Sequence, residues 1–315
     1  MPRAWTRTCV ACWAHRARES TAVNHPLARE IEADAANRLG LEGIEYIEYR
    51  SARPQALGHV LELMGFRPVA RHRSREVLLY RQGTMNAIVN AHGATDGEPP
   101  ALAAIALRVR DAAAAHRRVL ELGGWDVPVQ VAPMELHIPA IHGVGASRLY
   151  FVDRWREFSI YDVDFVPIPG TDPRPPALAG LHWFGLVQRV GAGRSADWVA
   201  FYGELLGFGV MGEDREAGVL PQGIVLRSPD GGLHLQLVEP DTPHGLAGAG
   251  ADGDHEHFER VALGAPDVPA AAAALRARGV RFVETGHLAV QPRGALTQSW
   301  LDGVMFELIH HEPPA

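Results

Sequence analysis

The stretch PQALGHVLELMGF (Pro54–Phe66) sets the fold, because its pattern recurs later in the chain as SADWVAFYGELLGF (Ser195–Phe208). In both, a turn or cap residue starts a helix of about three turns with apolar residues three to four apart, and a glycine ends it. An apolar strand precedes each helix (GIEYIEYRS or WFGLVQRV), and strand-like segments follow it (EVLLYRQGTMNAIVN or GIVLRSPDGGLHLQLVE). The recurrence predicts an internal structural repeat.

A second pair of segments follows in the same order. IALRVRDAAAAHRRVLELGG (Ile105–Gly124) matches VALGAPDVPAAAAALRARGV (Val261–Val280): a strand, an aspartate at a helix cap, an alanine-rich helix and a glycine stop. The chain is therefore interpreted as two homologous α+β halves, each built of paired βαβββ modules. Such modules form a cupped mixed sheet with helices outside, and the cup holds the ligand.

The proline-rich segment VPIPGTDPRPPALAG (Val166–Gly180) is interpreted as the joint between the halves. The expected domains are 37–170 and 171–315, the second carrying the candidate site. Residues 1–36 are expected to be a disordered N-terminal extension.

The two cysteines of the chain lie in this extension. With His15, Cys9 and Cys12 read Cys-x-x-Cys-x-x-His, a spacing that could hold zinc or undergo redox exchange. The start of the chain has no second ligand pair and no apolar periodicity, which favours the disordered extension, and its arginines imitate a transit peptide. Because the rest of the chain lacks cysteine, no disulfide is expected there and a cytoplasmic protein is the expectation.

Composition excludes several classes of function. The net charge of −7 argues against a nucleic-acid partner, and no apolar span is long enough for a membrane helix. All 30 basic residues are arginine, so no lysine can bind pyridoxal phosphate as a Schiff base. GAGADG (Gly248–Gly253) matches G-x-G-x-x-G literally but leads into an acidic loop, so no nucleotide is expected.

Several segments carry a family resemblance. MELHIPAIHGVGASRLYFVDR (Met134–Arg154), SIYDVDF (Ser159–Phe165), GIEYIEY and DGVMFELI resemble bacterial 4-hydroxyphenylpyruvate dioxygenases, of the vicinal-oxygen-chelate superfamily. The resemblance runs from about Asn37 to Ile309. It implies two tandem vicinal-oxygen-chelate domains. It also implies Fe(II) held in the C-terminal half by two histidines and one glutamate, with positions open for a 2-oxo acid and dioxygen.

The resemblance assigns the glutamate ligand to Glu307, on a strand in VMFELI. The first histidine position falls on Gly185 or, by a count from the other side, on Leu186. His182 lies three residues before Gly185, and an odd offset in a regular strand points to the opposite face. His182 is therefore interpreted as a residue at the start of the strand, with a ligand role as the alternative.

The second histidine position falls on Arg260, in GDHEHFERVAL (Gly253–Leu263). His257 is again an odd three residues away, so it is expected to face away from the cup, with metal binding as the alternative. Arg260 is expected to face the cup, where it would form a bidentate ion pair with Glu307. His310 and His311 are interpreted as solvated.

The substrate contacts of the family are present only in part. Gln298 matches a glutamine that contacts the substrate, whereas the family's pocket asparagine corresponds to Val238. Gln236, on the same strand as Val238, and Gly185 are also assigned to substrate binding.

Two functions follow from these residues. In the first, the chain binds a small aromatic or 2-oxo acid with a carboxylate, without normal iron chemistry, and Arg260 supplies the positive charge that the metal would give. Gly185 leaves space where the family has a ligand. In the second, the chain is an active Fe(II)-dependent dioxygenase that forms homogentisate in aromatic amino-acid catabolism, and bulges bring His182 and His257 inward. A homo-oligomer is expected in both.

Overall fold

A computed structural model describes residues 36–128, 135–156, 158–212, 223–240 and 255–312. The expectations for the cysteine pair and for Gly248–Gly253 lie outside these residues. No helix in the described part of the chain is long and apolar enough to cross a membrane.

The N-terminal half forms one mixed sheet. In chain order its elements are β1 (Leu41–Arg50), α2 (Pro54–Leu63), β2 (Arg67–His72), β3 (Val77–Gln82), β4 (Met85–Asn90), β5 (Ala101–Val109), α3 (Ala112–Glu121), β6 (Ala140–His142), β7 (Arg148–Val152), α4 (Ile160–Asp164) and β8 (Phe165–Pro167). The described strands pair in the order β6-β7-β5-β1-β4-β3-β2-β8. β1 and β5 run antiparallel at the centre, so each module contributes one side of the sheet.

The C-terminal half repeats this arrangement. Its elements are η1 (Leu178–Gly180), β9 (His182–Arg189), α5 (Ser195–Leu206), β10 (Gly209–Val210), β11 (Ile224–Arg227), β12 (His234–Val238), β13 (His257–Ala265), α6 (Val268–Arg276), η2 (Gly286–Leu288), β14 (Gly294–Leu296) and β15 (Phe306–His310). The described strands pair in the order β10-β11-β12-β9-β13-β15-β14, with β9 and β13 antiparallel at the centre. The two tandem cupped sheets predicted from the repeat are confirmed.

The helix boundaries follow from the residues that predicted them. Asp111 and Asp267 cap α3 and α6, each accepting a hydrogen bond from the backbone N–H three residues ahead, at 2.8 and 2.9 Å. After α2 and α5 the chain turns at Gly65 (φ 100°) and Gly207 (φ 75°), backbone conformations that favour glycine.

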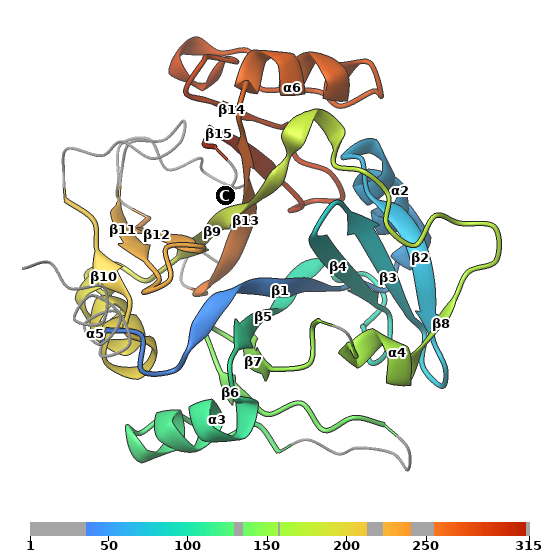
Figure 1. The fold of residues 1–315 in the computed structure, drawn as a ribbon. Helices are drawn as coiled ribbons and strands as arrows, with labels where there is room; N and C mark the ends of the chain where they lie inside the picture. The colour runs from blue at the N-terminus through green and yellow to red at the C-terminus, as the bar shows by residue number, and fades with distance from the viewer. Residues whose placement is uncertain (1–35, 129–134, 157, 213–222, 241–254, 313–315) are drawn as a thin grey trace, which may run out of the picture.

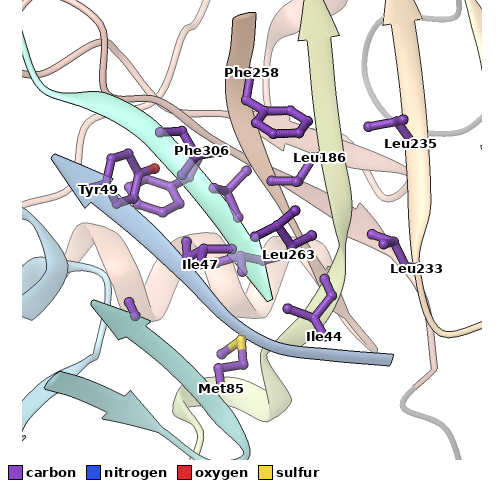
Figure 2. Packing of buried hydrophobic residues seen from close by; sticks show 14 of the residues in the cluster. Ile44, Ile47, Tyr49, Met85, Leu186, Leu233, Leu235, Phe258, Leu263 and Phe306 are labelled. Atoms are coloured by element: carbon purple, nitrogen blue, oxygen red, sulfur yellow. The ribbon is translucent and has the colours of Figure 1, made fainter. Parts of the chain in front are cut away.

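The two sheets share one apolar core. Buried residues of β1, β5, β9 and β13 belong to the same cluster as the apolar faces of α2, α3, α5 and α6. Figure 2 shows Ile47 and Tyr49 of the N-terminal half beside Leu263 and Phe306 of the C-terminal half. We call the side of each sheet that enters this cluster its core face and the opposite side its cup face. The cups therefore open away from one another, with the helices at the periphery (Figure 1).

Both halves carry the same two β-bulges. In the N-terminal half the strand register skips Glu45 of β1 and Ala103 of β5. In the C-terminal half it skips Phe184 of β9 and Glu259 of β13. The structural repeat thus extends to single irregular residues, and each bulge shifts which side chains face the cup.

Candidate functional site

The cup face of the C-terminal sheet is ordered in rows across four strands. Gln236, Val187 and Arg260 stand in one row on β12, β9 and β13. The next row is formed by the residues His234, Gly185, Ala262 and Glu307, the last on β15. Their chain neighbours Val261, Leu263, Phe306 and Leu308 lie in the shared core. The cup-facing orientation expected for Arg260 is confirmed.

Arg260 and Glu307 form the buried ion pair expected at this site. Nε of Arg260 donates to Oε2 of Glu307 at 2.9 Å, and the two residues are 2% and 0% exposed. The expected bidentate geometry is not formed, because Nη1 of Arg260 donates instead to Oε1 of Glu259, at 3.2 Å. Nη2 is buried and has no hydrogen-bond partner among the described residues. The guanidinium of Arg260 therefore donates to two carboxylates, and its Nη2 remains a buried donor without a hydrogen-bond partner in the described part of the chain.

Gly185 does not leave space in the cup, contrary to the sequence-based expectation. A Cβ atom added to Gly185 would lie 1.9 Å from the carbonyl oxygen of His234 on the neighbouring strand. Any side chain at this position would require the backbone to move. The alternative ligand position, Leu186, is excluded because its side chain lies in the shared core. At the first histidine position of the family, the backbone carbonyl of His234 thus leaves no room for a side chain.

The two bulges correct the orientation expected for His182 and His257. His182 pairs with Gly264 and Gly185 pairs with Ala262, so the bulge at Phe184 places His182 on the same face as Gly185. The bulge at Glu259 likewise turns His257 to the face of Arg260. Odd spacing predicted the opposite face because it assumed regular strands.

Although His182 and His257 lie on the cup face, their hydrogen bonds are with other residues and not with Glu307. His257 is exposed and its Nδ1 donates to the carbonyl of His255 at 2.7 Å. His182 donates from Nδ1 to the carbonyl of Gly180 at 2.9 Å, and its Nε2 is hydrogen-bonded to Nδ1 of His311 at 3.0 Å. His311 is half-buried and therefore not the solvated residue that the sequence predicted.

A cluster of aromatic rings surrounds His311, and no pattern in the sequence predicts it. Phe184 stacks on His234, with ring centroids 4.2 Å apart and an interplanar angle of 4°, and meets His311 edge-on. Burial lowers the pKa of His234 to about 4, although Nδ1 of His234 donates to the carbonyl of Phe184 at 3.4 Å, which acts in the opposite direction. Burial also lowers the pKa of His311. This wall of the cup is therefore aromatic, and His234 is uncharged at neutral pH.

The two glutamines assigned to substrate binding differ in position. Gln236 is buried in the row of Arg260. Gln298 lies beyond β14 and is exposed; its backbone N–H donates to the carbonyl of Arg281 at 2.8 Å. Of the two, only Gln236 stands in the row of Arg260, separated from it by Val187 of β9.

The side chains at the three ligand positions do not fit Fe(II). Gly185 offers no side chain, and the guanidinium of Arg260 stays protonated and occupies Glu307. Among the described residues, no group of three His, Cys, Asp or Glu side chains could hold a metal ion.

Two family models and several known proteins are similar in sequence to this chain. A family model described as hydroxyphenylpyruvate dioxygenase (HPPD), N-terminal, matches residues 35–166, and one described as the glyoxalase/bleomycin resistance protein/dioxygenase superfamily matches residues 181–295. The chain is 34% identical over 267 residues to hemolysin VllY of Vibrio vulnificus (strain CMCP6), covering 80% of this chain and 74% of that protein.

Two further proteins are similar over a smaller share of their own length. A 4-hydroxyphenylpyruvate dioxygenase of Pseudomonas sp. (strain P.J. 874) is 43% identical over 180 residues, 55% of this chain and 50% of that protein. A solved xylose isomerase-like TIM barrel/4-hydroxyphenylpyruvate dioxygenase fusion protein superposes with a TM-score of 0.69 at 25% identity, covering 87% of this chain and 50% of that chain. The chain therefore spans half the length of each of these two proteins.

Proposed function

Since the chain belongs to the 4-hydroxyphenylpyruvate dioxygenase family of the vicinal-oxygen-chelate superfamily, we propose that its C-terminal cup binds a small aromatic or 2-oxo acid without iron. The observation that carries the proposal is the buried guanidinium of Arg260 at a ligand position of the family, paired with Glu307. An arginine there supplies fixed positive charge at a position that is 2% exposed.

The unpartnered Nη2 of Arg260 supports a carboxylate as the ligand group. A buried donor without a partner costs about 1–3 kcal/mol, and a carboxylate oxygen would relieve that cost. Gln236, in the same row, adds a neutral amide, and the stacked rings of Phe184 and His234 offer an apolar wall for an aromatic body. The ligand that combines these features is 4-hydroxyphenylpyruvate or a close analogue.

The test separates the charge of Arg260 from the stability of the cup. Arg260→Gln alone would leave Glu307 buried and unpaired, so the informative variant is R260Q/E307Q, with E307Q as its matched control. We expect 4-hydroxyphenylpyruvate to bind the wild type and E307Q, and to bind R260Q/E307Q at least about tenfold more weakly, because a charge-assisted hydrogen bond is lost. Isothermal titration calorimetry measures the three affinities. Equal affinity of E307Q and R260Q/E307Q would refute the role of Arg260.

Iron-dependent dioxygenase activity is the competing function, favoured by the names of the relatives and by the bulges that turn His182 and His257 to the cup face. It requires both histidines to leave their present hydrogen bonds and Glu307 to leave Arg260. Metal analysis of protein purified anaerobically with excess Fe(II) decides between the two. One tightly bound iron per chain, with homogentisate formed from 4-hydroxyphenylpyruvate, would replace the proposal by this alternative.

A further inference from the structure

The cup of the N-terminal half is hollow, although the family resemblance assigns it no ligand. A cavity of about 770 Å³ lies at its open end, between the sheet and the segment that contains α4 and β8. In Figure 1 this segment lies beside the edge of the sheet formed by β2, β3 and β4. The volume falls within the range of about 300–1,000 Å³ that is typical of small-molecule sites.

The bulge residue Glu45 forms the polar floor of this cavity. Its side chain is 2% exposed and accepts hydrogen bonds from Nε of Arg108 at 2.6 Å and from Nδ2 of Asn86 at 3.1 Å. Oδ1 of Asn86 in turn accepts from Nε of Arg81 at 2.7 Å. Among the described residues that line the cavity, Glu45 is the buried acid. Arg108 of β5 pairs with it directly, and Arg81 of β3 is linked to it through Asn86.

The charge of the wall exceeds what Glu45 requires. Five arginines line the cavity against two acids, in a chain whose net charge is −7. The second acid, Asp162, is held in the capping box at the start of α4, where the backbone N–H of Ser159 donates to it at 2.8 Å. Arg73 and Arg174 form no ion pair with the described residues. The surplus of arginine in an acidic protein favours an anionic ligand.

The same cavity has an aromatic and apolar side. Val69, Leu79 and Phe165 line it beside the ring of Tyr161. The guanidinium groups of Arg108 and Arg156 lie 4.8 and 4.5 Å from the ring centroid of Trp155. This ring therefore contacts both the arginine that pairs with Glu45 and the one that pairs with Glu42. A flat ring would bury apolar surface here while its anionic group reached the arginines.

We propose that the N-terminal cup is a second ligand site, which binds an aromatic carboxylate through Arg81 and Arg108 independently of the C-terminal cup. The ring lies against the apolar side formed with Tyr161, and the carboxylate lies above the floor of Glu45. The matching bulge in the other half carries Phe184, so the two cups use the same backbone feature for opposite chemistries.

The experiment uses benzoate and 4-hydroxybenzoate as probes, with the full chain. E45Q/R108Q replaces the floor pair by neutral groups that can still hydrogen-bond, and R73A/R174A removes two exposed arginines without touching the core. R260Q/E307Q removes the charged groups of the other cup and is the background in which both variants are compared. Affinities come from calorimetric titration, and the thermal midpoint of each variant checks that the fold is retained.

We expect R260Q/E307Q, which lacks the charge of the C-terminal cup, to keep one benzoate site per chain. In this background, E45Q/R108Q is expected to weaken the binding of benzoate at least about tenfold and R73A/R174A severalfold. Loss of binding only in R260Q/E307Q would overturn the proposal, because the single site would then be the C-terminal cup. If benzyl alcohol binds as tightly as benzoate, the cavity is only an apolar pocket. If inorganic phosphate binds as tightly as benzoate, the cavity is only an anion-binding patch. Either result also overturns the proposal.

Discussion

Nε of Arg260 lies 2.9 Å from Oε2 of Glu307, and both side chains are almost completely buried. The two residues stand on adjacent strands, β13 and β15, at positions where the family resemblance implies two metal ligands. A protein cation thus occupies the carboxylate that a metal cation would otherwise hold. Arg260 offsets the charge of Glu307 and also donates to Glu259, and these contacts fix the direction of the guanidinium.

The stability of the cup depends on keeping both members of this pair. We expect Arg260→Ala to lower the free energy of unfolding by about 3–5 kcal/mol, because it leaves Glu307 buried without a counterion. R260M/E307L removes both charges and is expected to be about as stable as the wild type or more stable. Urea unfolding of both variants measures the difference. A single mutant no less stable than the double mutant would contradict the buried-pair account.

Histidines placed at positions 185 and 260 are not expected to create an iron site. We expect G185H/R260H to bind well below one iron per chain, because a Cβ at position 185 would lie 1.9 Å from the carbonyl oxygen of His234. The same contact should destabilise G185H, whereas R260H introduces no such backbone clash. Metal analysis after reconstitution with Fe(II), together with thermal unfolding, checks both statements. Stoichiometric iron in the double variant would show that the strand adapts.

Stability should fall as the pH decreases from about 6.5 to 4, in part through His234. The folded protein holds the pKa of His234 at about 4, below the unfolded value of about 6.5, so the unfolded chain binds more protons in this window. The contribution between pH 7 and pH 5 is about 2 kcal/mol. Urea unfolding of the wild type and of His234→Asn at both pH values isolates it. A pH dependence of the same size in the variant would exclude His234 as its source.

The two halves should unfold together. Leu186 is 2% exposed and lies in the core that both sheets share, so Leu186→Ala is expected to cost about 2–5 kcal/mol and to destabilise both halves. Leu122→Ala, at a residue that is 41% exposed, is the control and should change stability by less than about 0.5 kcal/mol. Differential scanning calorimetry should show one transition in all three proteins. Two resolved transitions, with only one displaced by Leu186→Ala, would contradict a common core.

The fold could be predicted from the sequence because the repeat is marked by short-range sequence features. Helix caps at Asp111 and Asp267 and glycines after the helices are short-range features, and the structure contains them. The face of Arg260 was also predictable, since its neighbours Val261 and Leu263 are apolar and enter the core.

The sheet face on which His182 and His257 lie could not be predicted, because a bulge does not change the pattern of apolar residues in the sequence. Phe184 and Glu259 are ordinary strand residues in the sequence, and only pairing with the neighbouring strand reveals that each is skipped. The closed space at Gly185 is likewise set by a backbone atom of another strand. Long-range strand pairing therefore decides the details of the site.

The matched bulges bear on how the chain arose. Glu45 and Phe184 occupy the same bulge in the two halves, as do Ala103 and Glu259, yet these side chains have no chemistry in common. A duplicated ancestral half accounts for both facts: the strand irregularities were inherited with the backbone, and the residues diverged afterwards. The two cups thus have the same strand geometry with different residues in it, so they differ in chemistry without any insertion or deletion at these bulges.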